Sequence, residues 1–176
     1  MSAGSPVTAI CPGTYDPVTN GHVDIIRRAA AIFDRVVVGV VREPSHKEPM
    51  FSVEERVAFL GEALAGVENV EIEEFAELVV DFARRWGAHT MVKGLRAISD
   101  FEWEFQMHHL NRTLAPEVET MYLIADSQYS FVSSSSVKEI ASFGGNVDGL
   151  VPDAVARRFQ QLFPSPKPGA PVSPQE

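Results

Sequence analysis

The stretch CPGTYDPVTNGHVD, residues 11–24, decides how this chain folds, because it joins a short apolar run to a helical pattern. The run VTAIC (7–11) is typical of a buried strand, and residues 20–33 repeat apolar side chains on one helical face. Between the two patterns stand two glycines, an Asp-Pro pair and a histidine. Two interpretations fit: an ordinary turn with an incidental histidine, or a loop that holds a phosphate.

The alternation of strand and helix continues along the chain. Further strands are expected at 35–41, 69–75, 89–94 and 120–125, and helices at 53–64, 77–87, 100–115, 134–142 and 153–163. Strands separated by helices form a parallel sheet with right-handed crossovers. We therefore predict an α/β fold: a single Rossmann-like domain over residues 1–163, with a five-stranded parallel sheet flanked by helices in a dinucleotide-binding topology. The Pro-rich tail 164–176 is expected to be disordered.

The expected helix at 100–115 carries more apolar surface than a one-sided helix needs. Trp103, Met107, Leu110 and Leu114 form one stripe, and further aromatic side chains flank it. Burial in the core of this chain is the preferred interpretation, and packing against a second subunit is the alternative.

Size, charge and cysteine content narrow the function classes. A chain of 176 residues suits one domain, and its net charge of −9 argues against a general nucleic-acid binder. It contains a single cysteine, no apolar run long enough to span a membrane and no signal-peptide pattern. These features lead us to expect a cytoplasmic protein without membrane or nucleic-acid partners.

Parallel sheets bind ligands beyond the carboxyl ends of their strands, where the strand order reverses. The stretch after the first strand supplies Gly13, for close backbone approach, and Thr14, with a hydroxyl and an N–H group. Thr19 or Asn20 would be the N-cap of the next helix, which places His22 in its first turn. That position, beside unpaired N–H groups and the positive end of the helix dipole, favours a phosphate.

Polar side chains follow other strands in the same way. Arg42 or Lys47 follows the second strand, although a loop lysine can simply be solvated, and Lys93 and Arg96 follow the fourth. Serines 133–136 open a helix after the fifth; one is explained as an N-cap, and the others suggest hydroxyl and N–H groups that face an anion.

Other chemistries have no support in the sequence. It contains no HExxH or CxxC metal motif, no P-loop and no Gly-x-Ser-x-Gly elbow. Cys11 is expected to be a small buried strand residue, and His108 and His109 point about 100° apart on a helix, which makes a poor metal pair. The remaining pattern is a polyphosphate site without a nucleophile, which suits nucleotidyl or phosphoryl transfer.

Four segments carry a resemblance to a known family. PGTYDPVTNGHVDII resembles the (H/T)xGH signature of the nucleotidyltransferase α/β superfamily, with Thr19 in the place of the first histidine. SHKEPMFSVEERV (45–57), VKGLRAISDFEWEFQMHHLNR (92–112) and YSFVSSSSVKEIA (129–141) resemble phosphopantetheine adenylyltransferases. All four occur in order, at matching distances, over nearly the whole chain to Phe163.

The resemblance implies an enzyme of coenzyme A biosynthesis. The family reversibly transfers the adenylyl group of ATP to 4′-phosphopantetheine, which gives 3′-dephospho-CoA and pyrophosphate. Mg²⁺ would accompany ATP, held mainly by phosphates and water. A homohexamer, a dimer of trimers, is implied as well, and so is coenzyme A as a feedback inhibitor in the same pocket.

The resemblance also implies roles for individual residues. His22, Lys47 and Arg96 would be catalytic, and Thr14, Lys47, Val79 and Lys93 would bind the acceptor; Lys93 stands where some members have arginine. The implied ATP contacts are Thr14, Tyr15, His22, Gly94, Leu95, Arg96, Glu104, Tyr129, Ser130, Phe131, Val132, Ser133, Ser134 and Ser135. Counting along the loop from its N-terminal side places His46 at the position of the family lysine, whereas counting back from Met50-Phe51 gives Lys47, which charge favours.

Two rival functions remain on this fold. A nicotinate mononucleotide adenylyltransferase or a glycerol-phosphate cytidylyltransferase would share the beginning of the pattern but differ in the later segments. A non-catalytic nucleotide sensor would bind ATP without turnover.

Overall fold

The computed structural model describes residues 6–44 and 48–164, and in it five parallel strands form one sheet. The expectations for His46 and Lys47, and for the tail from residue 165, fall outside the described residues. The strands are β1 (Thr8–Gly13), β2 (Arg35–Val41), β3 (Val70–Phe75), β4 (Thr90–Leu95) and β5 (Glu119–Ile124). Their order is β3-β2-β1-β4-β5, so the direction of winding reverses between β1 and β4. The predicted α/β class is confirmed.

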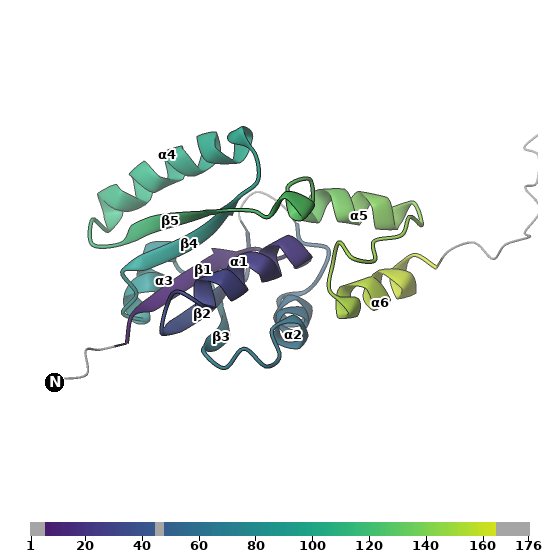
Figure 1. Cartoon of the computed structure of the whole chain (residues 1–176), viewed down its shortest axis with the longest axis horizontal. Coiled ribbons are helices and arrows are strands. Elements are labelled where there is room, and N and C mark those ends of the chain that lie inside the picture. The colour runs from purple at the N-terminus through teal and green to yellow at the C-terminus, as the bar shows by residue number, and fades with distance from the viewer. Residues whose placement is uncertain (1–5, 45–47, 165–176) are drawn as a thin grey trace, which may run out of the picture.

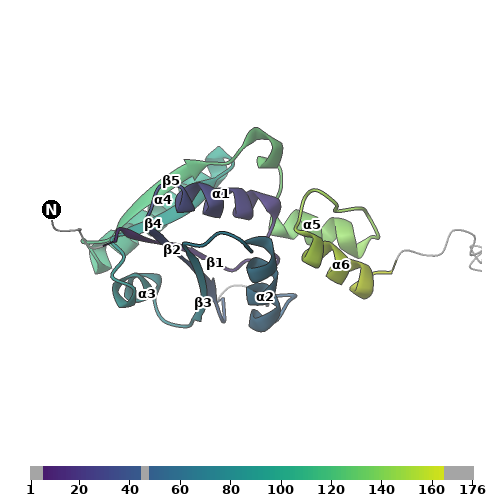
Figure 2. The same cartoon turned by 60° about the horizontal axis from the view of Figure 1, so that its bottom comes forward.

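Helices cover both faces of this sheet. They are α1 (Asn20–Ala30), α2 (Val53–Ala63), α3 (Val79–Arg85), α4 (Ile98–Leu114), α5 (Ser134–Ser142) and α6 (Asp153–Leu162), with a 3₁₀ turn, η1, at Ser127–Tyr129. Strand side chains alternate between the faces: Ala9 and Cys11 join an apolar cluster with α1, α2, α5 and α6, whereas Ile10 joins a second cluster with α3. Figure 1 shows α1 in front of the sheet and α3 behind it, and both views place α5 and α6 beyond the carboxyl ends of the strands (Figures 1 and 2). In the part of the chain that the structure describes, no helix is long and apolar enough to cross a membrane.

Three helix starts follow the local sequence signals. Thr19, one of the two predicted candidates, is the N-cap of α1, and Ser52 forms a capping box with Glu55 at the start of α2. Ser133 is the N-cap of α5, where its side chain accepts a hydrogen bond from the N–H of Ser136. Short-range hydrogen bonds of this kind depend on neighbouring residues, so the sequence predicts them well.

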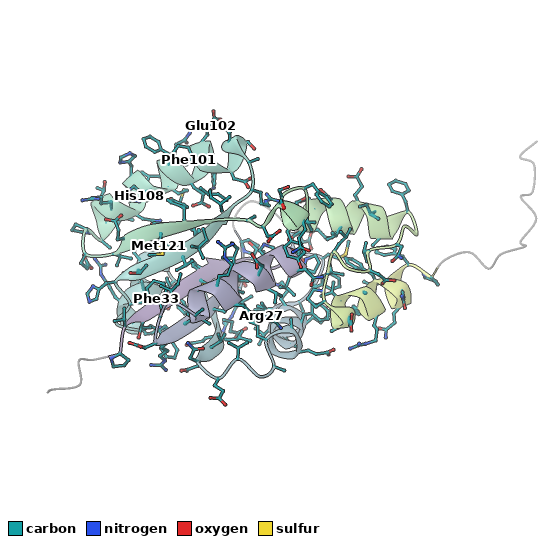
Figure 3. All side chains as sticks on the ribbon, viewed as in Figure 1. Arg27, Phe33, Phe101, Glu102, His108 and Met121 are labelled. Carbon is teal, nitrogen blue, oxygen red and sulfur yellow. The ribbon has the colours of Figure 1, made fainter. Side chains whose placement is uncertain are left out.

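The preferred interpretation of the apolar stripe on α4 was wrong. Trp103, Leu110 and Leu114 are each more than half exposed, Met107 is half-buried, and only Asn111 of the whole helix is buried. The side of α4 toward the sheet carries polar groups: Glu104 bonds to Lys93, and the buried Asn111 lies about two helical turns further along the same side. Trp103, Leu110 and Leu114 therefore face away from the sheet. Figure 3 shows Phe101 on the same helix and Met121 on the neighbouring strand β5.

Candidate active site

An open cleft of about 490 Å³ lies where the strand order reverses, at the carboxyl ends of β1 and β4. Its walls come from the β1–α1 loop, the start of α1, the end of β4, α4 and the segment from η1 to α5. The residues predicted from the sequence that line it are Tyr15, His22, Lys93, Gly94, Arg96, Glu104, Tyr129, Val132, Ser133, Ser134 and Ser135. Segments separated by more than a hundred residues thus meet at one place, as the strand-end rule predicts.

Five predicted contacts do not belong to the lining of this cleft, and Lys47 lies outside the described residues. Thr14 stands between the lining residues Gly13 and Tyr15, and its carbonyl accepts a hydrogen bond from Arg56. The others are Val79, which packs half-buried against the second apolar cluster; Leu95, which is buried; and Ser130 and Phe131, which are exposed beside η1. Leu95 lies on the same strand face as the lining residue Lys93, but its side chain is buried, so alternation along the strand alone does not show which of the two reaches the cleft.

His22 is held in place by the cap of its own helix. The backbone N–H of Thr19 donates to Nδ1 of His22 at 3.0 Å, and the Thr19 hydroxyl lies 3.0 Å from the same nitrogen. A backbone amide can only donate, so Nδ1 is the unprotonated nitrogen and the ring hydrogen resides on Nε2. The capping box thereby supplies a neutral imidazole whose donor nitrogen is Nε2, in the first turn of α1 at the cleft.

Tyr15 supports the histidine ring from one side. Its φ of 52° is unusual for a residue other than glycine, and its buried ring meets the His22 ring edge-on, with centroids 5.2 Å apart. The phenol donates to the carbonyl of Cys11 at 2.8 Å, so the hydroxyl is directed into the protein. A Cβ on Gly13 would lie 2.9 Å from Cζ of Tyr15, which means that this glycine makes room for the tyrosine ring.

The two cations at the end of β4 are each paired with a carboxylate from α4. Lys93 Nζ lies 2.7 Å from Glu104, with both side chains mostly buried. Arg96 binds both carboxylate oxygens of Asp100, at 3.0 and 3.1 Å, and donates to the carbonyl of Val132 at 2.8 Å. Burial raises the pKa of Asp100, but hydrogen bonds from the Arg96 side chain and backbone outweigh it and leave that pKa below its usual range. The cations are thus oriented, and the cleft is less positive than its lysine and arginine alone suggest.

Gly94 acts through packing. A Cβ at this position would lie 2.9 Å from Cγ1 of Ile25, so the missing side chain lets α1 approach the end of β4 closely. Since α1 carries His22, this close approach brings the histidine within the same cleft as Lys93 and Arg96.

The serine run is used mostly for bonds within the protein. The Ser133 hydroxyl caps α5 and lies 2.6 Å from the Ser136 hydroxyl, and the Ser134 hydroxyl donates to the carbonyl of Pro17 at 2.8 Å. The exposed Ser135 also lines the cleft. The α5 N-terminus therefore presents backbone N–H groups and one exposed serine to the cleft, with its other hydroxyls already bonded.

Sequence reasoning missed three residues that hold these parts together. The sequence presents Asp16 only as part of a turn, and it gives no signal for Arg56 or Lys138. Asp16 and Arg56 are almost fully buried, with 2% and 1% of their surface exposed. An arginine or lysine inside a helical pattern normally indicates a solvated face, so no local signal distinguishes them.

Cys11 lines the cleft, but its thiol is expected to be unreactive. Burial raises the pKa of its thiol to about 12. At pH 8 only about one molecule in ten thousand would hold a thiolate. We expect a thiol reagent to label the native protein at least about 100-fold more slowly than the denatured protein at this pH, because the thiolate is the reactive form. Since this is the chain's one cysteine, the label count is unambiguous; equal labelling rates would contradict the buried assignment.

Comparison with known proteins gives consistent similarities. The cytidylyltransferase-like family model matches residues 10–140. A phosphopantetheine adenylyltransferase from Thermomicrobium roseum is 51% identical over 157 residues, which cover 88% of this chain and 94% of the relative. Proteins of the same name from Rubrobacter xylanophilus and Alkaliphilus metalliredigens are each 52% identical, over 155 and 152 residues, covering 88% and 86% of this chain and 94% and 96% of the relatives.

Proposed function

This chain belongs to the phosphopantetheine adenylyltransferase family, nucleotidyltransferases of coenzyme A biosynthesis with a cytidylyltransferase-like domain, and we propose that its cleft performs the family's reaction on ATP and 4′-phosphopantetheine. A phosphate oxygen of 4′-phosphopantetheine attacks the α-phosphorus of ATP. A new P–O bond forms there, the bond between the α-phosphorus and the bridging oxygen breaks, and pyrophosphate leaves with that electron pair. The products are 3′-dephospho-CoA and pyrophosphate.

The acceptor needs no general base. A phosphate monoester loses its second proton at a pKa of about 6, so the attacking oxygen is already ionised at neutral pH. The protein's task is then to position two anionic reactants and to stabilise the charge that gathers on the α-phosphate.

His22 is the proposed donor to that α-phosphate. Its ring is oriented before substrate binds, because Nδ1 is held by Thr19 and one face is supported by Tyr15. A donor fixed in this way need not reorganise as the transition state forms, which is the main source of electrostatic catalysis. This placement of His22 together with Lys93 and Arg96 is the observation that carries the proposal.

Lys93 and Arg96 are proposed to take the remaining phosphates. Lys93 would hold the phosphate of the acceptor and Arg96 the phosphates of ATP, with Lys47 as a further cation. A phosphate bound by Lys93 would compete with Glu104 for the ammonium group or bind beside it. A phosphate bound by Arg96 would do the same with Asp100. The α5 N-terminus would receive ATP phosphates on its N–H groups. Gly94 and Tyr129 also belong to the proposed ATP site.

Magnesium is proposed to enter with ATP. Among the described residues, the carboxylates that line the cleft are Glu104 and Asp100, which are engaged by Lys93 and Arg96, so the donor set fits an ion held chiefly by phosphate oxygens and water. When bound, Mg²⁺ supplies charge neutralisation on the phosphates. We also propose a cytoplasmic location, which the single unpaired cysteine supports, and feedback binding of coenzyme A in the same cleft.

The test of this function measures pyrophosphate release from ATP and Mg²⁺ with three acceptors: 4′-phosphopantetheine, nicotinate mononucleotide and buffer. We expect release with 4′-phosphopantetheine alone. Release with nicotinate mononucleotide would identify that compound as the acceptor in place of 4′-phosphopantetheine. ATP binding without release would indicate a nucleotide sensor.

A homohexamer is part of the proposal, supported by the outward apolar side of α4. Leu110→Glu is expected to lower the particle mass in analytical ultracentrifugation, because a charge would then enter an interface between copies. Ile32→Glu is the matched control, since Ile32 is 57% exposed against 59% for Leu110 but lies after α1. A monomeric wild-type protein, or an unchanged mass for Leu110→Glu, would contradict this interface.

A further inference from the structure

Asp16 is a buried carboxylate that the proposed chemistry does not use. It lies in the β1–α1 loop with 2% of its surface exposed. Its oxygens accept hydrogen bonds from the backbone N–H groups of Met50 and Phe51, at 3.1 and 3.0 Å. The ammonium group of Lys138, on α5, completes the set at 2.5 Å. One side chain therefore connects three segments that are far apart in the sequence.

The charge balance makes the contact with Lys138 specific. A carboxylate is expensive to bury unless a cation and hydrogen bonds compensate it. Lys138 supplies the cation, and its own side chain is only 20% exposed. If α5 moved away, Asp16 would lose the contact with Lys138 and, among its described partners, would keep only the two backbone N–H donors. The ion pair therefore favours one position of α5 relative to the β1–α1 loop.

A second bond connects the same two elements closer to the cleft. The hydroxyl of Ser134, in the first turn of α5, donates to the carbonyl of Pro17, which follows Asp16. The loop leads directly to Thr19 and His22, whereas the first turn of α5 carries Ser133 to Ser135 on the cleft lining. The two contacts thus connect the loop that leads to the histidine with the helix end that we propose holds the ATP phosphates.

We propose that the Asp16–Lys138 ion pair is a positioning pair for adenylyl transfer, which sets the α5 N-terminus against His22. The inference rests on the proposed function. Neither side chain needs to touch a substrate: the pair fixes the distance between the phosphate-holding helix end and the donor to the α-phosphorus. Misplacement of a reacting group by about 1 Å can lower a rate about 100-fold, so we expect loss of the ion pair to lower turnover.

The decisive variant is Lys138→Met, compared with Lys138→Arg and Arg157→Met. Arg157 pairs with Glu62 between α6 and α2, so Arg157→Met likewise removes one positive charge and one ion pair between distant segments, but outside the lining of the cleft. We expect Lys138→Met to lower kcat about 10- to 100-fold. The KM for 4′-phosphopantetheine should stay within about twofold of the wild-type value. Lys138→Arg should restore most of kcat, and Arg157→Met should leave it unchanged.

A double variant covers the case in which Lys138→Met fails to fold. Asp16→Asn with Lys138→Met removes the buried charge together with its partner, and we expect it to fold with the same loss of kcat. Wild-type kcat in either variant, or an equal loss in Arg157→Met, would overturn the positioning role. Failure of the wild-type protein to release pyrophosphate would instead overturn the proposed function, so the two failures are distinguishable.

Discussion

Replacing His22 by alanine is expected to lower kcat about 100- to 1,000-fold while ATP still binds with nearly unchanged affinity. The reason is that the ring donates to charge that develops on the α-phosphate in the transition state, whereas the phosphates of bound ATP have other partners. Rates of pyrophosphate release, together with calorimetric titration of ATP, separate the two quantities.

The alanine variant also removes a helix cap, because Nδ1 of His22 accepts from the backbone N–H of Thr19. His22→Gln is the matched control: a glutamine at the third helical position can complete a capping box with Thr19. It should keep the thermal stability of the wild-type protein and still lose turnover. If ATP affinity fell in both variants while kcat stayed unchanged, His22 would bind the ground state and the transition state equally, and the proposed role would be wrong.

Arg56→Met is expected to have the largest effect on stability, lowering the free energy of unfolding by about 3 kcal/mol or more. The guanidinium, 1% exposed, donates to five backbone carbonyls at 2.8 to 3.3 Å. They belong to Thr14, Val41, Arg42, Phe51 and Ser52. Burial lowers the pKa of this arginine, although the charges of Asp16 and two glutamates oppose the shift. Its loss would leave buried acceptors unpaired at the ends of β1 and β2 and at the start of α2.

Denaturant unfolding checks this prediction against two variants. Arg56→Lys should recover only part of the stability, because an ammonium group has three donors and cannot reproduce the planar fork. Arg27→Met should change it by less than about 0.5 kcal/mol, since Arg27 makes an exposed hydrogen bond to the carbonyl of Ala63. Wild-type stability in Arg56→Met would mean that water replaces the guanidinium.

Much of the candidate site could be predicted from sequence because parallel strands bring their carboxyl ends together. Tyr15, His22, Lys93, Arg96 and the residues from Ser133 to Ser135 line one cleft, as expected. Their roles in binding and catalysis remain predictions. The positions of Val79 and Phe131 could not be derived in this way, since the strand-end rule gives the edge of the sheet and not the direction of each side chain.

Hydrogen bonds and periodicities over three or four residues were determined by the sequence itself. The β-branched run of β2, the caps at Thr19, Ser52 and Ser133, and the alternation of strands and helices all depend on neighbours along the chain. Such local terms are nearly independent of the rest of the fold, so they can be predicted without it.

The tertiary structure alone decided which charges meet and which apolar surface is covered. Asp16 meets Lys138 across 122 residues, and Arg56 reaches Thr14 across 42. The stripe of α4 faces outward because Glu104 and Asn111 occupy the side toward the sheet. A buried charge is stabilised only by the partner that folding brings to it, and an apolar stripe has no preferred direction until its neighbours are in place.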